Sequence, residues 1–215
     1  MGLLVDAWQY IADDPSRFLD ELSVHIRLSL SALLLAIAIF VPLGVLASRL
    51  GRTGPPLVAL VGAARVVPSL AVLFLLLPRF GTGFTPALIA LTVLAGPPIV
   101  VNTDAGLRGV DAAVIESARG LGMNALQVFG KVSFPLALPV VIAGVRTAAV
   151  EVIASATLAA FIGAGGLGIF ILSGITLVDE RLLLVGAIPV ALLALTAEGL
   201  LGLTERLLTP PATSR

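Results

Sequence analysis

The sequence predicts an all-α polytopic transmembrane bundle with about five spans, on three observations. Hydrophobic residues fill 58% of the 215 positions and charged residues only 12%, about half the charged fraction of a soluble domain. Three stretches of 21, 24 and 27 residues carry no ionisable side chain, and about 20 apolar residues suffice for one crossing. The 22 glycines and 14 prolines suit close helix packing better than the short alternating strands of a lipid-exposed barrel.

The composition also excludes several classes of protein. So few charged groups are not typical of a cytosolic enzyme or a disordered chain, and 13 Lys and Arg balanced by 13 Asp and Glu exclude a nucleic-acid binder. Cysteine is absent and His25 is the single histidine, which excludes disulfides, thiolate chemistry and a histidine-based metal site. We expect no cofactor and no metal, and we expect His25 to be an interfacial residue.

Charged residues mark the boundaries of the segments. We expect a membrane domain over residues 28–203, between an extracytoplasmic tail, 1–27, and a cytoplasmic tail, 204–215. With the N-terminus outside, the inner segments hold seven Lys and Arg against four in the outer ones, which favours an N-out, C-in orientation. The expected spans are about 28–48, 55–78, 84–101, 136–162 and 182–203, with one long cytoplasmic loop at 102–135.

The long loop carries its own helix signals. Asp111 is a good N-cap for a helix that Gly120 and Gly122 end, and Asn124 followed by Gln127 forms a capping-box pattern for a second short helix. Prolines then mark the return into the membrane. The result is a helix–glycine–helix hairpin in the cytoplasm, which we interpret as a docking surface for another protein; its apolar side would comprise Ile115, Ala118, Leu121 and Leu126.

The stretch ESARGLGMNALQVFGKVSFPLALP resembles the EAA loop of the membrane subunits of bacterial ABC importers. Ser117 stands where that pattern has alanine, and Val132 and Phe134 replace Ile and Leu, all with small changes in size. Residues at matching positions are Glu116, Ala118, Gly122, Val132 and Pro135. Other runs, among them RVVPSLAVL and RTAAVEVIASATLAAFIGAGGLG, look like permeases that import osmoprotectants such as glycine betaine, carnitine or choline.

This resemblance implies a type I importer permease in the bacterial cell membrane. Two permease subunits, identical or related, would form the pore within the lipid, and each would insert its loop into a cytosolic ABC ATPase dimer. An extracytoplasmic solute-binding protein would deliver the solute, and the chain itself would not be an enzyme. Glu116 and Arg119 would offer polar contacts to the ATPase, while Ala118 and Gly122 would permit close backbone approach.

Three alternatives remain open. The first is the same machine for another small solute, such as an amino acid. The second is an ion-coupled secondary transporter that depends on Glu151 or Glu198 and not on an ATPase. The third is a membrane scaffold without transport activity.

A glycine cluster near the last span fits G-x-G-x-x-G, but a dinucleotide site needs a strand before it and a helix after it. The cluster follows a membrane helix instead, so we interpret it as a flexible outer loop that takes part in a gate. The only lysine, Lys131, lacks the rest of a P-loop, so ATP hydrolysis would belong to a separate subunit. The glycines of the cluster are Gly163, Gly165, Gly166 and Gly168.

Four ionisable residues lie inside the expected spans, where charge is expensive. Arg146 and Glu151 are five residues apart, about 140° around a helix, so each needs a partner on another span. Glu198 is one candidate, and Arg65 precedes the helix-bending Pro68. These residues either line the solute pathway or form buried structural pairs. Because the single Trp and single Tyr both lie in the outer tail, the spans offer no aromatic cage for a quaternary ammonium ion.

Overall fold

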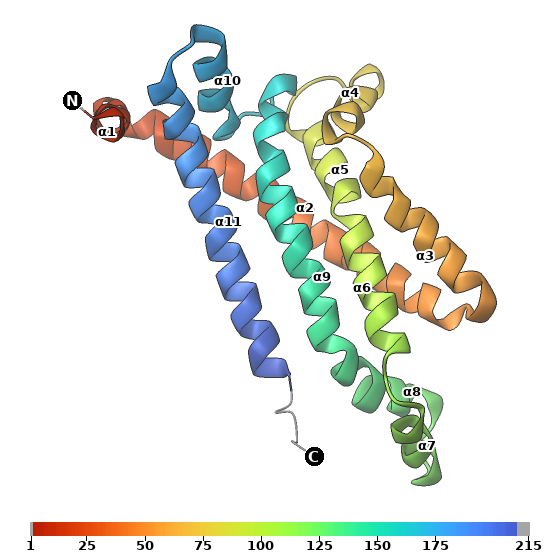
Figure 1. The fold of residues 1–215 in the computed structure, drawn as a ribbon. Coiled ribbons are helices and arrows are strands. Elements are labelled where there is room, and N and C mark those ends of the chain that lie inside the picture. Colours follow the sequence, from red (N-terminus) through yellow and green to blue (C-terminus); the bar gives the residue numbers. More distant parts are fainter. Residues whose placement is uncertain (1, 210–215) are drawn as a thin grey trace.

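The computed structural model describes residues 2–209, and these residues form helices and turns without a strand. Figure 1 shows α6, α9 and α11 running side by side, with α2 crossing behind them obliquely. This arrangement confirms the predicted all-α fold. The α-helices are α1 Leu3–Asp13, α2 Pro15–Arg49, α3 Gly54–Ala63, α4 Ser69–Phe80, α5 Phe84–Leu94, α6 Gly96–Arg108, α7 Ala112–Gly120, α8 Ala125–Val128, α9 Phe134–Ser155, α10 Gly168–Leu177 and α11 Glu180–Leu208.

Four continuous helical stretches are long and apolar enough to cross a membrane, and a bent pair makes up to a fifth. The bent pair joins Gly51–Val66 to Ser69–Phe80 at 91°, so the second expected span is not one straight helix. Val67 has an extended conformation (φ −71°, ψ 121°), because the proline after it disfavours the helical region. The continuous stretches are Pro15–Arg49, Phe84–Arg108, Ala125–Ile162 and Glu180–Leu208.

Several expected boundaries differ from the helix ends. Helix α2 begins at Pro15, since the Asp14 carboxylate caps it by accepting from the Arg17 N–H at 3.1 Å. Together with α1, it makes nearly all of the expected outer tail, 1–27, helical. Residues 102–108 of the expected loop belong to α6. The last helix runs to Leu208, and residues 210–215 of the expected C-terminal tail lie outside the described part of the chain.

The helix that returns from the loop does not stop at its prolines. A π-helical turn, Phe129–Ser133, connects α8 to α9, and Pro135 lies just after this turn, where the irregular hydrogen-bond pattern accommodates a residue without an N–H. A short 3₁₀ segment, Ala156–Ile162, then ends the same continuous stretch. Helix α10 was not expected as a separate element.

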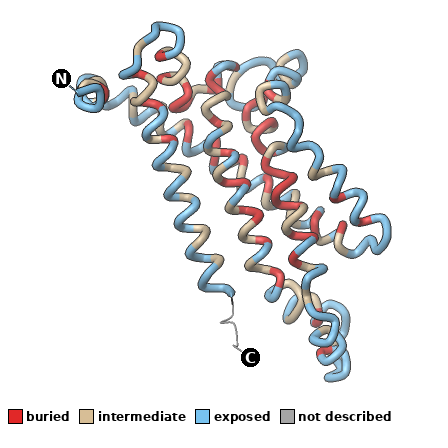
Figure 2. The backbone as a smooth tube through the Cα atoms, in the orientation of Figure 1, coloured by how far each residue is buried: buried red, intermediate tan, exposed pale blue. Residues whose placement is uncertain are grey.

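Small side chains let the central helices approach closely. Ala32 and Ala36 of α2, Ala87 and Ala90 of α5 and Ala148 of α9 are all 0% exposed, the composition that favours close packing between membrane helices. Figure 2 shows the buried residues gathered along α5, α6 and α9, whereas α3 and α11 are largely exposed. The exposed apolar faces of these outer helices suit contact with lipid or with another subunit.

Candidate coupling hairpin and intramembrane ion pairs

Helices α7 and α8 form a hairpin that projects from the end of the bundle at which α11 ends (Figure 1). The Asp111 carboxylate caps α7 by accepting from the Ala113 N–H at 2.8 Å. At the start of α8, Gln127 N–H donates to the Asn124 side chain and Asn124 N–H donates to the Gln127 side chain, both at 2.9 Å. The N-cap and the capping box predicted from the sequence are therefore confirmed, and the hairpin fixes its own ends.

Gly122 closes α7 in a left-handed conformation, with φ at +84°. Its N–H donates to Arg119 O at 2.9 Å and the Met123 N–H donates to Ala118 O at 3.3 Å, the two bonds of a Schellman motif. No heavy atom lies within 4 Å of the place a Cβ would take. Within this chain the backbone conformation, and not close approach by a neighbour, requires glycine here.

The residues of the EAA-like loop divide between two environments. Ala118 is only 6% exposed, on the helix that packs against α8 and the π-helical turn. Leu121 and Leu126, expected on the same apolar side, are 85% and 79% exposed. Glu116, Ser117, Arg119 and Pro135 are exposed, and Val132 is half-buried. The hairpin therefore presents a polar and apolar outer surface around a small internal contact.

The base of the hairpin is tied to the ends of α2 and α6. The Arg49 guanidinium lies 4.4 Å from the centroid of the Phe129 ring. Arg108 donates to the Asp104 carboxylate at 2.8 Å and to Ala47 O, at the end of α2, at 2.9 Å. Sequence reasoning missed this junction, although Asp104 and Arg108 have the i,i+4 spacing of a helical ion pair.

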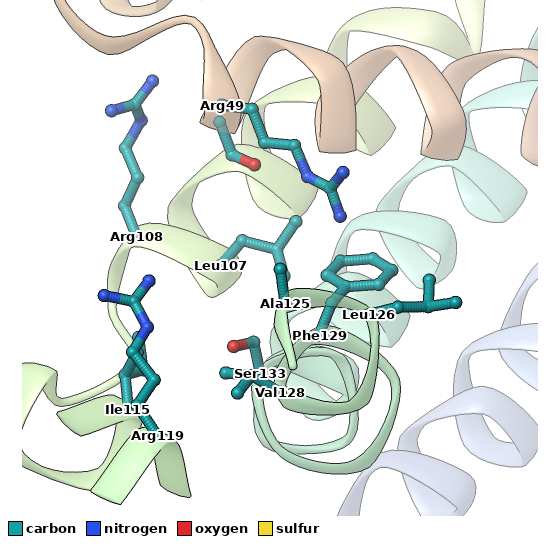
Figure 3. Close-up of a pocket in the computed structure, with 11 residues that line it drawn as sticks. Arg49, Leu107, Arg108, Ile115, Arg119, Ala125, Leu126, Val128, Phe129 and Ser133 are labelled. Atoms are coloured by element: carbon teal, nitrogen blue, oxygen red, sulfur yellow. The ribbon is translucent and has the colours of Figure 1, made fainter. Parts of the chain in front are cut away.

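A pocket of about 690 Å³ lies at this junction. Figure 3 shows Arg49, Arg108 and Arg119 reaching into the region between the end of α2, the end of α6 and the hairpin. Among the described residues, those that line the pocket include no acidic side chain. The residues that line this pocket are therefore basic or uncharged.

The four charged residues inside the expected spans, Arg65, Arg146, Glu151 and Glu198, form two separate clusters. Arg65 Nη2 lies 3.4 Å from Glu151 Oε1, and each side chain is 44% exposed. Arg146 lies 3.4 Å from Glu198 and 3.2 Å from Glu205, so each residue finds its partner on another helix. Glu205 was missed, yet it lies seven residues after Glu198, on the same face of α11 two turns away.

The glycine cluster after α9 forms a turn that is tied to α2. Gly163, Gly165 and Gly166 have positive φ, and the Gly166 N–H donates to Glu21 Oε2 at 2.6 Å. Gly168 is not a loop residue, because it begins α10, where a Cβ would overlap the carbonyl group of Thr157.

His25 supports the same turn. Its side chain is 0% exposed and its Nε2 lies 3.1 Å from Ile153 O on α9. The expectation of an interfacial histidine is therefore wrong. From the sequence, His25 was expected at the end of a span. Helix α2 begins ten residues before His25, and the helix face that carries His25 packs against α9 and Gly166.

Comparison with known proteins identifies the family. Residues 28–209 match the family described as binding-protein-dependent transport system inner membrane component. The carnitine transport permease protein OpuCB of Listeria monocytogenes is 45% identical over 98% of this chain and 90% of its own length. The choline transport system permease protein OpuBB of Bacillus subtilis is 38% identical over 96% and 95%.

A solved structure shares the fold. The membrane subunit found in the inward-facing MetNI methionine ABC transporter matches with a TM-score of 0.81, at 20% identity, over 90% of this chain and 96% of its own. The helical architecture, the span composition and the family match agree. The chain is a multi-pass permease of the bacterial plasma membrane with a type I ABC importer fold, and it belongs to the family of binding-protein-dependent transport system inner membrane components.

Proposed function

We propose that this permease moves a compatible solute such as carnitine, choline or glycine betaine into the cytoplasm, driven by a separate cytosolic ATPase. Relatives at 45% and 38% identity are named as carnitine and choline permeases, which supports this solute class. The likeness to the methionine transporter, at 20% identity, supports the fold alone and gives no reason to prefer an amino acid.

The observation that carries the proposal is the self-capped hairpin at the end of a continuous helix. The stretch Ala125–Ile162 is 38 residues long, or roughly 57 Å at about 1.5 Å per residue. It runs from the hairpin to the glycine turn at the opposite end of the bundle. A push on α8 therefore reaches the far end through one helix, as a lever between an ATPase and a gate requires.

The proposed assembly contains two permease subunits, identical or related, an ATPase dimer at the hairpins and an extracytoplasmic solute-binding protein. In Figure 1 helix α1 and the end of α11 lie at opposite ends of the bundle, which supports an odd number of crossings, five in the proposed N-out, C-in arrangement. Glu116, Ser117 and Arg119 then offer polar contacts to the ATPase, with Leu121 and Leu126 as apolar contacts.

The remaining site residues receive proposed roles from their contacts. Arg146 holds α11 to α9 through Glu198 and Glu205, a structural role. The turn formed by Gly163, Gly165 and Gly166, anchored by Glu21, belongs to the outer gate.

Replacement of residues 112–131 by a Gly/Ser tether of equal length tests the proposal. We expect the variant to lose both co-purification of the ATPase and ATP-driven uptake in proteoliposomes. A Gly/Ser replacement of α1 serves as control, because α1 lies at the opposite end of the bundle, and should keep the ATPase bound. Undiminished uptake by the tether variant would refute ATPase coupling and favour an ion-coupled transporter.

A further inference from the structure

The break between α3 and α4 exposes irregular backbone beside a charged pair. Val66 and Val67, next to the 91° bend, are 84% and 47% exposed. Non-helical backbone at membrane depth is tolerated only where protein buries it or where it lines a water-filled cavity. The described residues of this chain do not bury the segment. The Arg65 and Glu151 charges beside it favour water over the apolar surface of a second subunit, so we place the segment on the wall of a wet pathway.

A pocket of about 310 Å³ opens at this break, at the small end of the roughly 300–1,000 Å³ range of ligand sites. Arg65, Ser69, Glu151 and Ser155 give it polar groups from both sides of the break and from α9. None of the residues that line it is aromatic. A cation in this pocket must therefore be held by a carboxylate and not by an aromatic cage.

The Arg65–Glu151 pair combines one positive and one negative charge and is accessible from outside the chain, unlike the cluster around Arg146. Its single contact of 3.4 Å leaves 44% of each side chain exposed, so further guanidinium donors and carboxylate lone pairs can face a ligand. Arg146, in contrast, is already paired with two carboxylates of α11. A ligand with one negative and one positive group can bind between Arg65 and Glu151 without leaving either charge unpaired.

We infer that Arg65 and Glu151 form a selectivity site for small zwitterions on the solute pathway. Arg65 binds the carboxylate of the solute and Glu151 binds its quaternary ammonium group. This inference rests on the proposed function and adds the two residues that select zwitterionic solutes. A simple cation would pair with Glu151 but separate Arg65 from its counter-ion, which is costly in a low-dielectric pathway. The site therefore favours glycine betaine over choline, which has a hydroxymethyl group in place of the carboxylate.

Ligand-observed NMR on the permease–ATPase complex in nanodiscs, without binding protein, tests this site with millimolar glycine betaine or choline. We expect the wild-type complex to bind glycine betaine about tenfold more tightly than choline, the lower end expected for a hydrogen bond to a charged group. Arg65→Gln should bring glycine betaine down to the level of choline. Glu151→Gln should weaken both solutes, whereas the control Arg146→Gln should leave their ratio unchanged.

A purely structural ion pair would change both solutes equally, so the ratio separates the two roles. Equal binding in the wild-type complex, or a ratio that Arg65→Gln leaves unchanged, would overturn the inference. If size-exclusion chromatography shows that Arg65→Gln prevents assembly, Arg65→Lys is used in its place. This variant should keep a reduced preference for glycine betaine over choline. An undiminished preference, or none, in Arg65→Lys would count against the site. ATP-driven uptake by the wild-type importer is measured in parallel. If the wild-type importer shows no ATP-driven uptake, the proposed function is refuted. If it shows uptake but Arg65→Gln leaves the ratio of glycine betaine to choline binding unchanged, only the inference is refuted.

Discussion

Two neighbouring glycines of the hairpin should respond in opposite directions to the same substitution. Gly122 has φ at +84° and ends α7, while Gly120 is the last helical residue and lacks positive φ. A Cβ at either position meets no heavy atom within 4 Å, so sterics within the chain do not contribute. Backbone preference alone then sets the sign of each effect.

The magnitudes follow from that preference. An L-residue in the left-handed region costs about 1–2 kcal/mol, so Gly122→Ala should destabilise the hairpin by this amount. Gly120→Ala should stabilise it by about 0.5–1 kcal/mol, because alanine is the better helix former. At about 1.4 kcal/mol per tenfold, local opening becomes roughly five- to thirtyfold more frequent in the first variant and about two- to fivefold rarer in the second.

Hydrogen exchange of the segment 112–131, followed by mass spectrometry on the purified permease, measures both effects. Equal exchange in the two variants, or slower exchange in Gly122→Ala, would refute the Schellman assignment. Gly122→Asn adds a further distinction, because asparagine tolerates the left-handed conformation. It should preserve the hairpin, and if it then still abolishes ATPase binding, close approach by the partner also requires glycine at this position.

Five further substitutions test the N-cap of α7, the packing around Gly168 and the ion pairs of Arg146. Asp111→Ala removes the N-cap of α7 and should cost about 1 kcal/mol, seen as faster exchange of the first α7 amides; unchanged exchange would exclude a capping role. Gly168→Ala places a Cβ against the carbonyl group of Thr157 and should lower the stability measured by thermal unfolding by about 1–3 kcal/mol. The control Gly199→Ala, with open space around it, should be neutral or stabilising. Equal effects of the two substitutions would contradict the close contact at Gly168. Arg146→Gln leaves two carboxylates without their counter-ion and should lower the midpoint more than Glu198→Gln, which leaves one pair intact; the reverse order would contradict the shared ion pair.

Local signals in the sequence predicted the hairpin well because its determinants lie within a few residues of one another. The Asp111 N-cap and the capping box of Asn124 and Gln127 involve residues two and three positions apart. The residue types at those positions are therefore enough to predict these hydrogen bonds. The long apolar stretches likewise predicted the membrane class, since span length depends on bilayer thickness alone.

Features that depend on distant contacts were not predictable in this way. The burial of His25 depends on Ile153, and the second carboxylate on Arg146 comes from Glu205. Helix α10 is ten residues long, too short to span, so hydropathy does not distinguish it from the rest of its apolar run. Pro68 indicated a bend, but its size depends on what packs around the break.

Site-specific cross-linking tests the central claim, that the hairpin contacts the ATPase, most directly. The chain contains no cysteine, so Leu126→Cys introduces one thiol for a photoreactive label at a position that is 79% exposed on α8. Leu4→Cys, at a position 66% exposed on α1, is the control at the opposite end of the bundle. We predict that the label at position 126 cross-links the ATPase with a yield that changes when ATP binds, while the label at position 4 does not reach it. Equal cross-linking from both positions, or none from position 126 in an active importer, would contradict this account.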